Sequence, residues 1–233
     1  ISVLVMLCTA ILGKVIYRHR EERKAKVFRY GLVNSNALFI GLPIIQSLLG
    51  DAGVLQLSMY MIFVRMFCWS YGLSLYTGVK SDWKGSFKRL LTHPCMIAAA
   101  LGVAAMVTGI RLPAFLDRTL QYVSSCLMAL SMLLIGVVLS EIKLKEVFRG
   151  DVWRFTALRL GVMPGIVFGL CKLCGVPYIV TATCTLVSGM PAASLTAVLA
   201  ARYHGDSELG ALLVAVSTIL SAVTIPLWFM ILQ

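Results

Sequence analysis

Charged residues are scarce in this chain of 233 residues, where lysine, arginine, aspartate and glutamate make up 13% and hydrophobic residues 59%. A soluble globular domain carries about twice that charged fraction, ~25%. The mean hydropathy is +0.89, and apolar runs of about 20 residues, long enough to cross a bilayer, recur along the sequence. The low charge therefore excludes an ordinary soluble domain and predicts an all-α polytopic membrane protein.

Catalytic and metal-binding patterns are also missing. No Asp or Glu falls clearly inside a predicted span, and the spans contain no H-E-x-x-H motif, no serine–histidine arrangement and no paired carboxylates. The three histidines share no ligand spacing. Cys171 and Cys174 form a C-x-x-C pair, but without the βαβ context of a redox motif. We therefore expect no enzyme, no cofactor and no metal site.

A signal-peptide pattern is not expected in residues 1–17 either, because they have neither an n-region nor a cleavage site. The first residue is Ile1 rather than methionine, so we expect the sequence to begin inside a longer natural chain. The net charge of +11 could suggest a nucleic-acid partner. In a membrane protein, however, basic residues are counted by side of the membrane. We therefore expect the lipid bilayer and no nucleic acid as a partner.

Hydropathy and helix breakers predict eight membrane-spanning helices. Their approximate ranges are 1–17, 29–50, 54–78, 93–110, 116–140, 153–174, 176–201 and 209–232. The predicted units are 1–78, a cytoplasmic connector over 79–92, and 93–233.

Basic residues are distributed unevenly between the two sets of connectors. Fifteen follow the first, third, fifth and seventh helices: Arg18, Arg20, Arg23, Lys24, Lys26, Arg29, Lys80, Lys84, Lys88, Arg89, Lys143, Lys145, Arg149, Arg154 and Arg202. Three follow the others: Arg111, Arg118 and Lys172. Because lysine and arginine accumulate in cytoplasmic loops, the first set faces the cytoplasm. We expect an integral protein of the cell membrane with both ends of this sequence outside.

An internal repeat connects two proline-containing helices. Gly41-Leu42-Pro43 in the second helix recurs as Gly189-Met190-Pro191 in the seventh, and the two helices run in opposite directions through the membrane. Paired Gly/Pro interruptions in two inverted halves are the best sequence indicator of a transporter site at the bilayer midplane. A simple proline kink is the alternative, since membrane helices tolerate one, but its recurrence in inverted units favours two crossed, broken helices.

Each break should leave backbone groups unpaired, because proline has no N–H and clashes with the preceding turn. We expect free amides at residues 44–46 and 192–194, where half-helix N-termini would favour anions. Asn34 and Asn36 could bond the freed carbonyls, a substrate or the other broken helix. The candidate substrate-binding residues are Asn34, Asn36, Gly41, Pro43, Arg65, Ser188, Gly189, Pro191 and Ala192.

Arg65 is included because it lies near the middle of the third predicted span. A charge at that depth costs at least ~2.5–3.5 kcal/mol and is a functional candidate by default. It could attract a carboxylate, and the alternatives are that it bonds carbonyls exposed by the breaks or snorkels. Lys14 and Arg159 lie near predicted cytoplasmic helix ends, where we expect snorkelling.

Several runs resemble the auxin efflux carrier family, which includes plant auxin carriers and bacterial malate and malonate permeases. They are VNSNALFIGLPI (Val33–Ile44), MALSMLLIGVVL (Met128–Leu139), LRLGVMPGIV (Leu158–Val167), SGMPAASLTAVLAARY (Ser188–Tyr203) and STILSAVTIPL (Ser217–Leu227). The resemblance covers essentially the whole chain. It implies ten helices in two inverted five-helix repeats, with the fourth and ninth broken and crossing. The eight spans here would then be the third to tenth, with 93–233 as the complete second repeat. The transport unit would be complete and the scaffold half present.

These features together predict a secondary carrier of a small organic anion, either a dicarboxylate such as malate or malonate or an auxin-like carboxylate. The carrier would work by alternating access at the crossing. The alternatives are a transporter-like ligand-sensing membrane domain, a channel, and a relative of the bile-acid-type sodium symporters, which share the crossed helices. The coupling ion stays open, although the missing intramembrane carboxylates favour a facilitated or sodium-linked process over proton symport. A homodimer through the scaffold helices is an open alternative to a monomer.

Overall fold

The computed structural model describes residues 2–77, 94–109, 112–140 and 147–233. Within these ranges the chain is helical, and the one β-type pairing is an isolated bridge between Ser35 and Ala192. Helices occur at each of the eight predicted places, so the all-α class is confirmed. The predicted connector over 79–92 lies outside the described residues.

The first part of the chain folds into helices that belong to the first three predicted spans. They are α1 (Ser2–Ile16), α2 (Glu22–Val33), the π-helix η1 (Ala37–Gly41), α3 (Leu42–Phe67), the π-helix η2 (Cys68–Gly72) and α4 (Leu73–Thr77). The basic stretch after α1 was predicted as a connector, but α2 already begins at Glu22. Ion pairs of Lys24 with Glu21 (3.3 Å) and of Lys26 with Glu22 (2.8 Å) support this first turn.

The second part contains the remaining five predicted helices. The elements are α6 (Pro94–Thr108), α7 (Ala114–Ser140), α8 (Gly150–Ala157), the π-helix η4 (Leu158–Val162), α9 (Met163–Leu173), α10 (Tyr178–Ser188), α11 (Leu195–Arg202) and α12 (Ser207–Leu232). α8, η4 and α9 form one continuous span. The span predicted over 176–201 is divided between α10 and α11.

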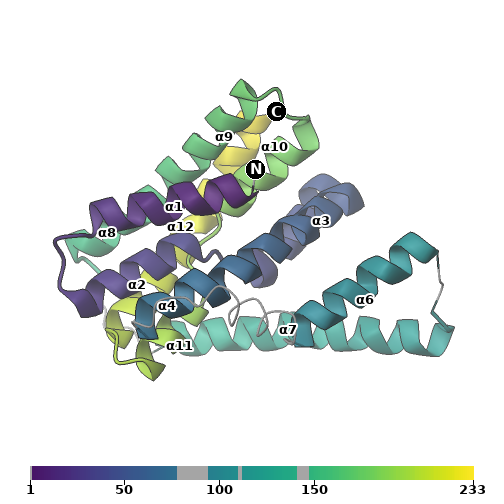
Figure 1. Ribbon diagram of the computed structural model, residues 1–233, viewed down its shortest axis with the longest axis horizontal. Coiled ribbons are helices and arrows are strands. Elements are labelled where there is room, and N and C mark those ends of the chain that lie inside the picture. Colours follow the sequence, from purple (N-terminus) through teal and green to yellow (C-terminus); the bar gives the residue numbers. More distant parts are fainter. Residues whose placement is uncertain (1, 78–93, 110–111, 141–146) are drawn as a thin grey trace.

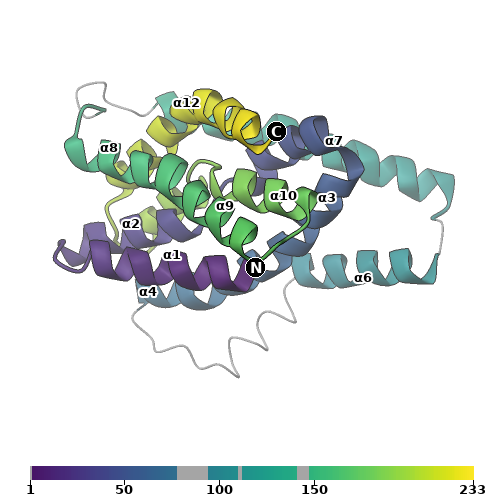
Figure 2. The same ribbon diagram turned by 90° about the horizontal axis from the view of Figure 1, so that it is seen from above.

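In space, the helices form a body with a hairpin beside it (Figures 1 and 2). The body contains α1, α2, α3 and α8 to α12, whereas α6 and α7 extend to one side of it. α7 contacts the body through η1 and α12. The start of α1 and the end of α12 lie at the end of the body opposite to the α1–α2 and α11–α12 connectors.

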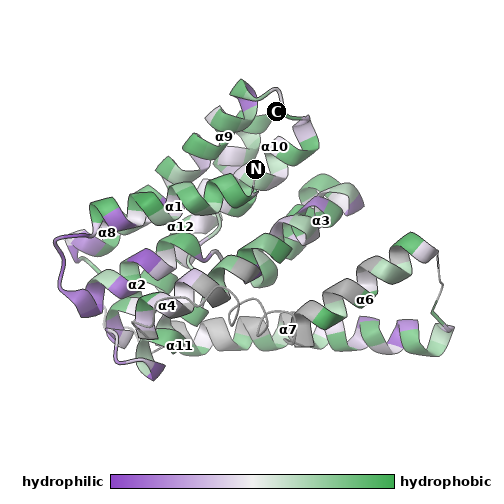
Figure 3. Ribbon diagram, in the orientation of Figure 1, coloured by the Kyte–Doolittle hydropathy of each residue, from purple (hydrophilic) through white to green (hydrophobic). Residues whose placement is uncertain are grey.

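Among the described residues, three helical segments are long and apolar enough to cross a bilayer: Ala37–Arg65, Gly150–Leu173 and Ser207–Leu232. α1 and α10 are apolar but shorter. Hydrophilic residues gather at the end of the body where α2 begins and α11 ends (Figure 3). At that end Arg23 Nε donates to the His204 carbonyl at 3.1 Å, so the connectors after α1 and α11 meet.

Local chemistry explains several helix ends and bends. α9 ends in a Schellman motif, in which Gly175 (φ 63°) donates to Lys172 O and Val176 donates to Cys171 O. α3 bends at Gly50 (φ 63°, ψ −159°), a backbone conformation that glycine alone adopts readily. Two helices therefore meet at Gly50, in agreement with the two segments predicted on either side of residues 51–53.

Prolines follow the π-helices η1 and η4, at Pro43 and Pro164. A wider turn before each proline lets the helix continue although the proline has no N–H and would clash with an ordinary preceding turn. Pro164 leaves the Leu160 carbonyl without its usual helical donor. The indole N–H of Trp228 on α12 donates to that carbonyl at 2.8 Å, which links η4 to α12.

Two clusters of buried hydrophobic side chains hold the body together. One includes Val33, Ala37 and Met190, together with residues of α1, α3, α9 and α10. The other includes Leu32 and Ala192, together with residues of α2, α8, α11 and α12. Each of the two interrupted helices therefore passes from one cluster to the other at its break.

Candidate functional site

The interruptions of the two helices lie against each other. Ser35 and Ala192 form an antiparallel bridge. The Asn36 N–H donates to Pro191 O at 2.8 Å, and the Ala193 N–H donates to Asn34 O at 3.0 Å. Backbone groups that a membrane interior cannot satisfy are therefore paired between the two breaks. The two breaks are therefore joined through their backbones, and this meeting point is called the crossing below.

The first break is not at Gly41-Leu42-Pro43, where we predicted it. The interruption is Asn34–Asn36, and helical structure resumes at η1 and continues into α3. The Asn36 carbonyl accepts hydrogen bonds from Ile40 and Gly41, both at 3.2 Å. The predicted free amides at 44–46 lie inside α3, so that prediction is wrong. The π-helix accommodates Pro43, whereas asparagine readily leaves helical geometry.

The second break is at the predicted place. α10 ends at Ser188, and α11 begins at Leu195 after Gly189-Met190-Pro191. The amides we expected to be free are paired, however. The Ala192 N–H donates to Ser217 Oγ of α12 at 3.1 Å, and the Ala193 N–H bonds the first break. A helix N-terminus with bare amides at 192 and 193 is therefore not present.

Arg159 is the functional candidate that the sequence reasoning missed. Its side chain is 2% exposed, although we expected it to snorkel. Nε donates to Met190 O at 3.1 Å and Nη1 donates to Leu32 O at 2.6 Å. We had considered that Arg65 bonds backbone carbonyls exposed by the breaks, and it is Arg159 that makes such bonds. The missed signal was the helix start, because α8 begins at residue 150 rather than 153 and so places Arg159 ~13 Å into the span.

A cavity of about 170 Å³ opens beside the crossing. Its lining residues come from the first break and η1, from the second half of α3 and the start of η2, and from the second break and the start of α11: Asn34, Ser35, Asn36, Leu38, Phe39, Met61, Val64, Arg65, Cys68, Ala193, Ser194 and Leu195. Arg65 is half-buried there, and within the described residues its guanidinium makes no hydrogen bond and no ion pair. The structure therefore brings a free cation to the broken backbone.

The nine predicted site residues are all near the crossing, but only three line this cavity: Asn34, Asn36 and Arg65. The other six have structural contacts. Pro191 and Ala192 belong to the backbone pairing of the breaks. Ser188 Oγ bonds Thr185 O in its own helix. Gly41 packs against Met190, Gly189 packs against Pro164, and Pro43 follows η1. Substrate binding by any of the nine stays a prediction.

Nearly the whole chain matches a known family. The model of the membrane transport protein family aligns with residues 1–86 and 83–229. This chain belongs to the membrane transport protein family. The resemblance to auxin efflux carriers is thereby confirmed.

Two archaeal relatives agree with the family match. An uncharacterized transporter of Methanocaldococcus jannaschii is 27% identical over 229 residues, which is 94% of this chain and 71% of that protein. An uncharacterized transporter of Methanothermobacter thermautotrophicus is 27% identical over 238 residues, covering 100% of this chain and 78% of that protein. The chain is therefore an integral membrane transporter.

The polar groups at the transporter's cavity include unpaired donors besides Arg65. Asn34 Nδ2 donates to the Tyr30 hydroxyl at 2.9 Å, which fixes the orientation of that amide. The amide nitrogen of Asn36 and the hydroxyl of Ser194 are buried without a hydrogen-bond partner. No carboxylate is among the described lining residues. The arrangement of one cation and unpaired donors is suited to bind an anion.

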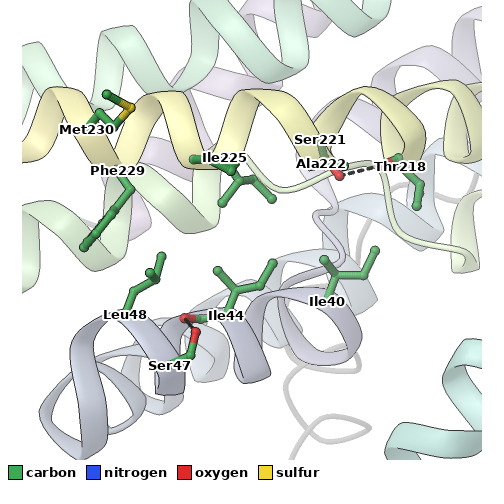
Figure 4. Close-up of a pocket in the computed structure, with 11 residues that line it drawn as sticks. Ile40, Ile44, Ser47, Leu48, Thr218, Ser221, Ala222, Ile225, Phe229 and Met230 are labelled. Carbon is green, nitrogen blue, oxygen red and sulfur yellow. Dashed lines mark hydrogen bonds between the residues drawn. The ribbon is translucent and has the colours of Figure 1, made fainter.

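A second, larger cavity of about 520 Å³ lies between η1 and α3 on one side and α12 on the other (Figure 4). Ile40, Ile44 and Leu48 face Ile225 and Phe229 across it. The hydroxyls of Ser47 and Ser221 bond backbone carbonyls of their own helices. Its walls therefore have no free polar group comparable to Arg65, and the smaller cavity is the better candidate for an ionic substrate.

Proposed function

We propose that this transporter carries a small organic anion, which binds in the cavity beside the crossing. The substrate class is a dicarboxylate such as malate or malonate, or an auxin-like carboxylate. The observation that carries the proposal is the Arg65 guanidinium, which has no acid partner among the described residues and lines the cavity with the unpaired Asn36 amide. A half-buried cation without a counterion is partly desolvated, and a bound carboxylate would supply the counterion.

The arrangement of the helices supports alternating access as the mechanism. The body contains both broken helices and their crossing, whereas α6 and α7 stand beside it as the scaffold side (Figure 2). We propose that the body belongs to two inverted units, 1–78 and 93–233, and moves against the scaffold to expose the cavity to each side in turn. The connectors at the end of the body where α2 begins would face the cytoplasm of the cell. A homodimer through the scaffold helices stays a prediction.

Flux into proteoliposomes tests this function. The purified chain is reconstituted, and uptake of labelled malate, malonate and indole-acetate is measured with and without ion gradients. We expect saturable uptake of at least one of these anions and counterflow when the vesicles are preloaded with it. Binding without net flux would instead indicate a ligand sensor, and flux without saturation or counterflow would indicate a channel. Either result would contradict the proposal that the protein is a carrier.

A further inference from the structure

Arg159 lies where the carbonyl ends of both broken helices converge. Leu32 is in the last turn of α2, and Met190 follows the end of α10 within the second break. The Arg159 side chain reaches both carbonyls from η4, a third element, through Nε and Nη1. One guanidinium thus joins two helix ends that are 158 residues apart in sequence.

The charge of Arg159 has no acidic counterion among the described residues, since none of the recorded ion pairs involves it. A helix C-terminus carries roughly half an elementary negative charge. Two such ends together supply about one, which matches the single positive charge of the guanidinium. The broken backbone therefore compensates the buried cation through Nε and Nη1, whereas Nη2 is buried without a hydrogen-bond partner among the described residues.

In transporters with broken helices, unwound carbonyls and half-helix C-termini are the groups that coordinate a coupling Na⁺. Here the Leu32 and Met190 carbonyls already accept hydrogen bonds from a fixed positive charge. A sodium ion at the same place would compete for these oxygens and be repelled by the guanidinium. The groups that could hold a transported cation are thus in use.

We propose that Arg159 is a built-in cation that takes the place of a coupling sodium ion at the crossing, so that the fold and the transport cycle are independent of Na⁺. The independence of the transport cycle from Na⁺ rests on the proposed function. The independence of the fold from Na⁺ does not, because it concerns the stability of the crossing in the absence of substrate.

Thermal unfolding of the purified full chain, without substrate, tests the cation site directly. The Tm is measured in sodium chloride and in choline chloride at equal ionic strength. We expect the same Tm in both salts for the unaltered protein. Arg159→Met should lower the Tm in choline, and sodium should raise the Tm of this variant by about 2–4 °C, the shift that a modest gain in stability gives a chain of this size.

Two further variants distinguish the effect of the positive charge at residue 159 from the effect of removing an arginine elsewhere. Arg154→Met removes an exposed arginine from the same helix and should leave the Tm unchanged in both salts. Arg159→Lys keeps a positive charge at the site, so its Tm should not depend on sodium. If Arg159→Met does not fold, the unaltered protein and Arg159→Lys still test the proposal. A higher Tm in sodium than in choline for either protein would overturn it. A destabilised Arg159→Met variant that sodium does not stabilise would also overturn it.

Uptake measurements complete the test. If malonate is transported, uptake by the unaltered protein should be equal with an inward sodium gradient and with choline. Sodium-driven uptake would overturn the proposal. If no anion is transported, the proposed function fails, whereas the salt dependence of the Tm still supports or overturns the role of Arg159.

Discussion

Replacing Arg65 by glutamine removes the charge from the cavity while keeping a neutral, shorter hydrogen-bonding side chain. Arg65 is the only lysine or arginine among the described lining residues, and Asn34, Asn36 and Ser194 are neutral. If the substrate is an anion bound at this cavity, its carboxylate loses its one charged partner in Arg65→Gln. Neutral donors remain, so binding should weaken without being abolished.

The size of the effect follows from the half-buried position of Arg65. Two opposite charges ~4 Å apart attract by about 4 kcal/mol near a protein surface, which is an upper bound because removing both from water costs free energy. A hydrogen bond to a charged group contributes ~1.5–3 kcal/mol net. We therefore expect the Kd or KM for the transported anion to rise about 10–150-fold in Arg65→Gln.

The assay is concentration-dependent uptake into proteoliposomes, with substrate binding to the purified protein as a second measurement. Arg65→Lys should be impaired less than Arg65→Gln, because it keeps the charge but loses the fork of donors. Arg118→Gln on the exposed surface of α7 is the matched control and should behave like the unaltered protein. Unchanged affinity and flux in Arg65→Gln would refute the reasoning, since the cavity would then not use its cation.

Two predictions concern the packing that holds the crossing in place. Ser217→Ala removes the acceptor of the buried Ala192 N–H (3.1 Å) and should destabilise the protein by ~1–3 kcal/mol, measured as a lower Tm. Gly210→Val places a Cβ 2.9 Å from the Ala197 Cα, so α11 and α12 must separate, which should cost ~1–3 kcal/mol in the same measurement.

Matched variants distinguish these contacts from general effects of substitution. Ser58→Ala removes an exposed hydroxyl that bonds only the carbonyl four residues earlier in its helix, and it should leave the Tm nearly unchanged. Gly169→Ala adds a Cβ that meets nothing within 4 Å and should not lower the Tm. If Ser217→Ala and Gly210→Val were as stable as these controls, the inferred packing at the second break would be wrong.

The helices could be predicted from the sequence because their signals are local. Long apolar runs between basic or glycine-containing connectors placed helices at all eight positions, and Gly189-Met190-Pro191 gave the correct position of the second break. The position of the first break was predicted wrongly because we took Gly41 and Pro43 as the point where the helix is interrupted. A proline preceded by a π-helix continues a helix, and no residue pattern in the sequence indicated that Ala37–Gly41 would form one.

The cavity could be predicted only in part. Which polar groups stay free depends on hydrogen bonds between the two breaks, which lie far apart in the sequence. Asn34, Asn36 and Arg65 were identified from their chemistry at positions where a membrane helix has little use for them. The amides at 192 and 193 were expected to be open, but Ser217 Oγ and the Asn34 carbonyl accept their hydrogen bonds. Residue 194 was predicted only for a free backbone amide, whereas Ser194 lines the cavity and has an unpartnered hydroxyl.

The two arginines near the crossing have different electrostatic surroundings, and this difference assigns them different tasks. Arg159 donates to carbonyls at the negative ends of two helices, so its charge is compensated largely by backbone before any substrate arrives. Arg65 has no such partner within the described residues and lines the cavity. The attraction for an anion must therefore come mainly from Arg65, and the backbone geometry that positions Asn34 and Asn36 beside it must depend on Arg159. Loss of Arg65 should then change affinity at constant stability, whereas loss of Arg159 should change stability first.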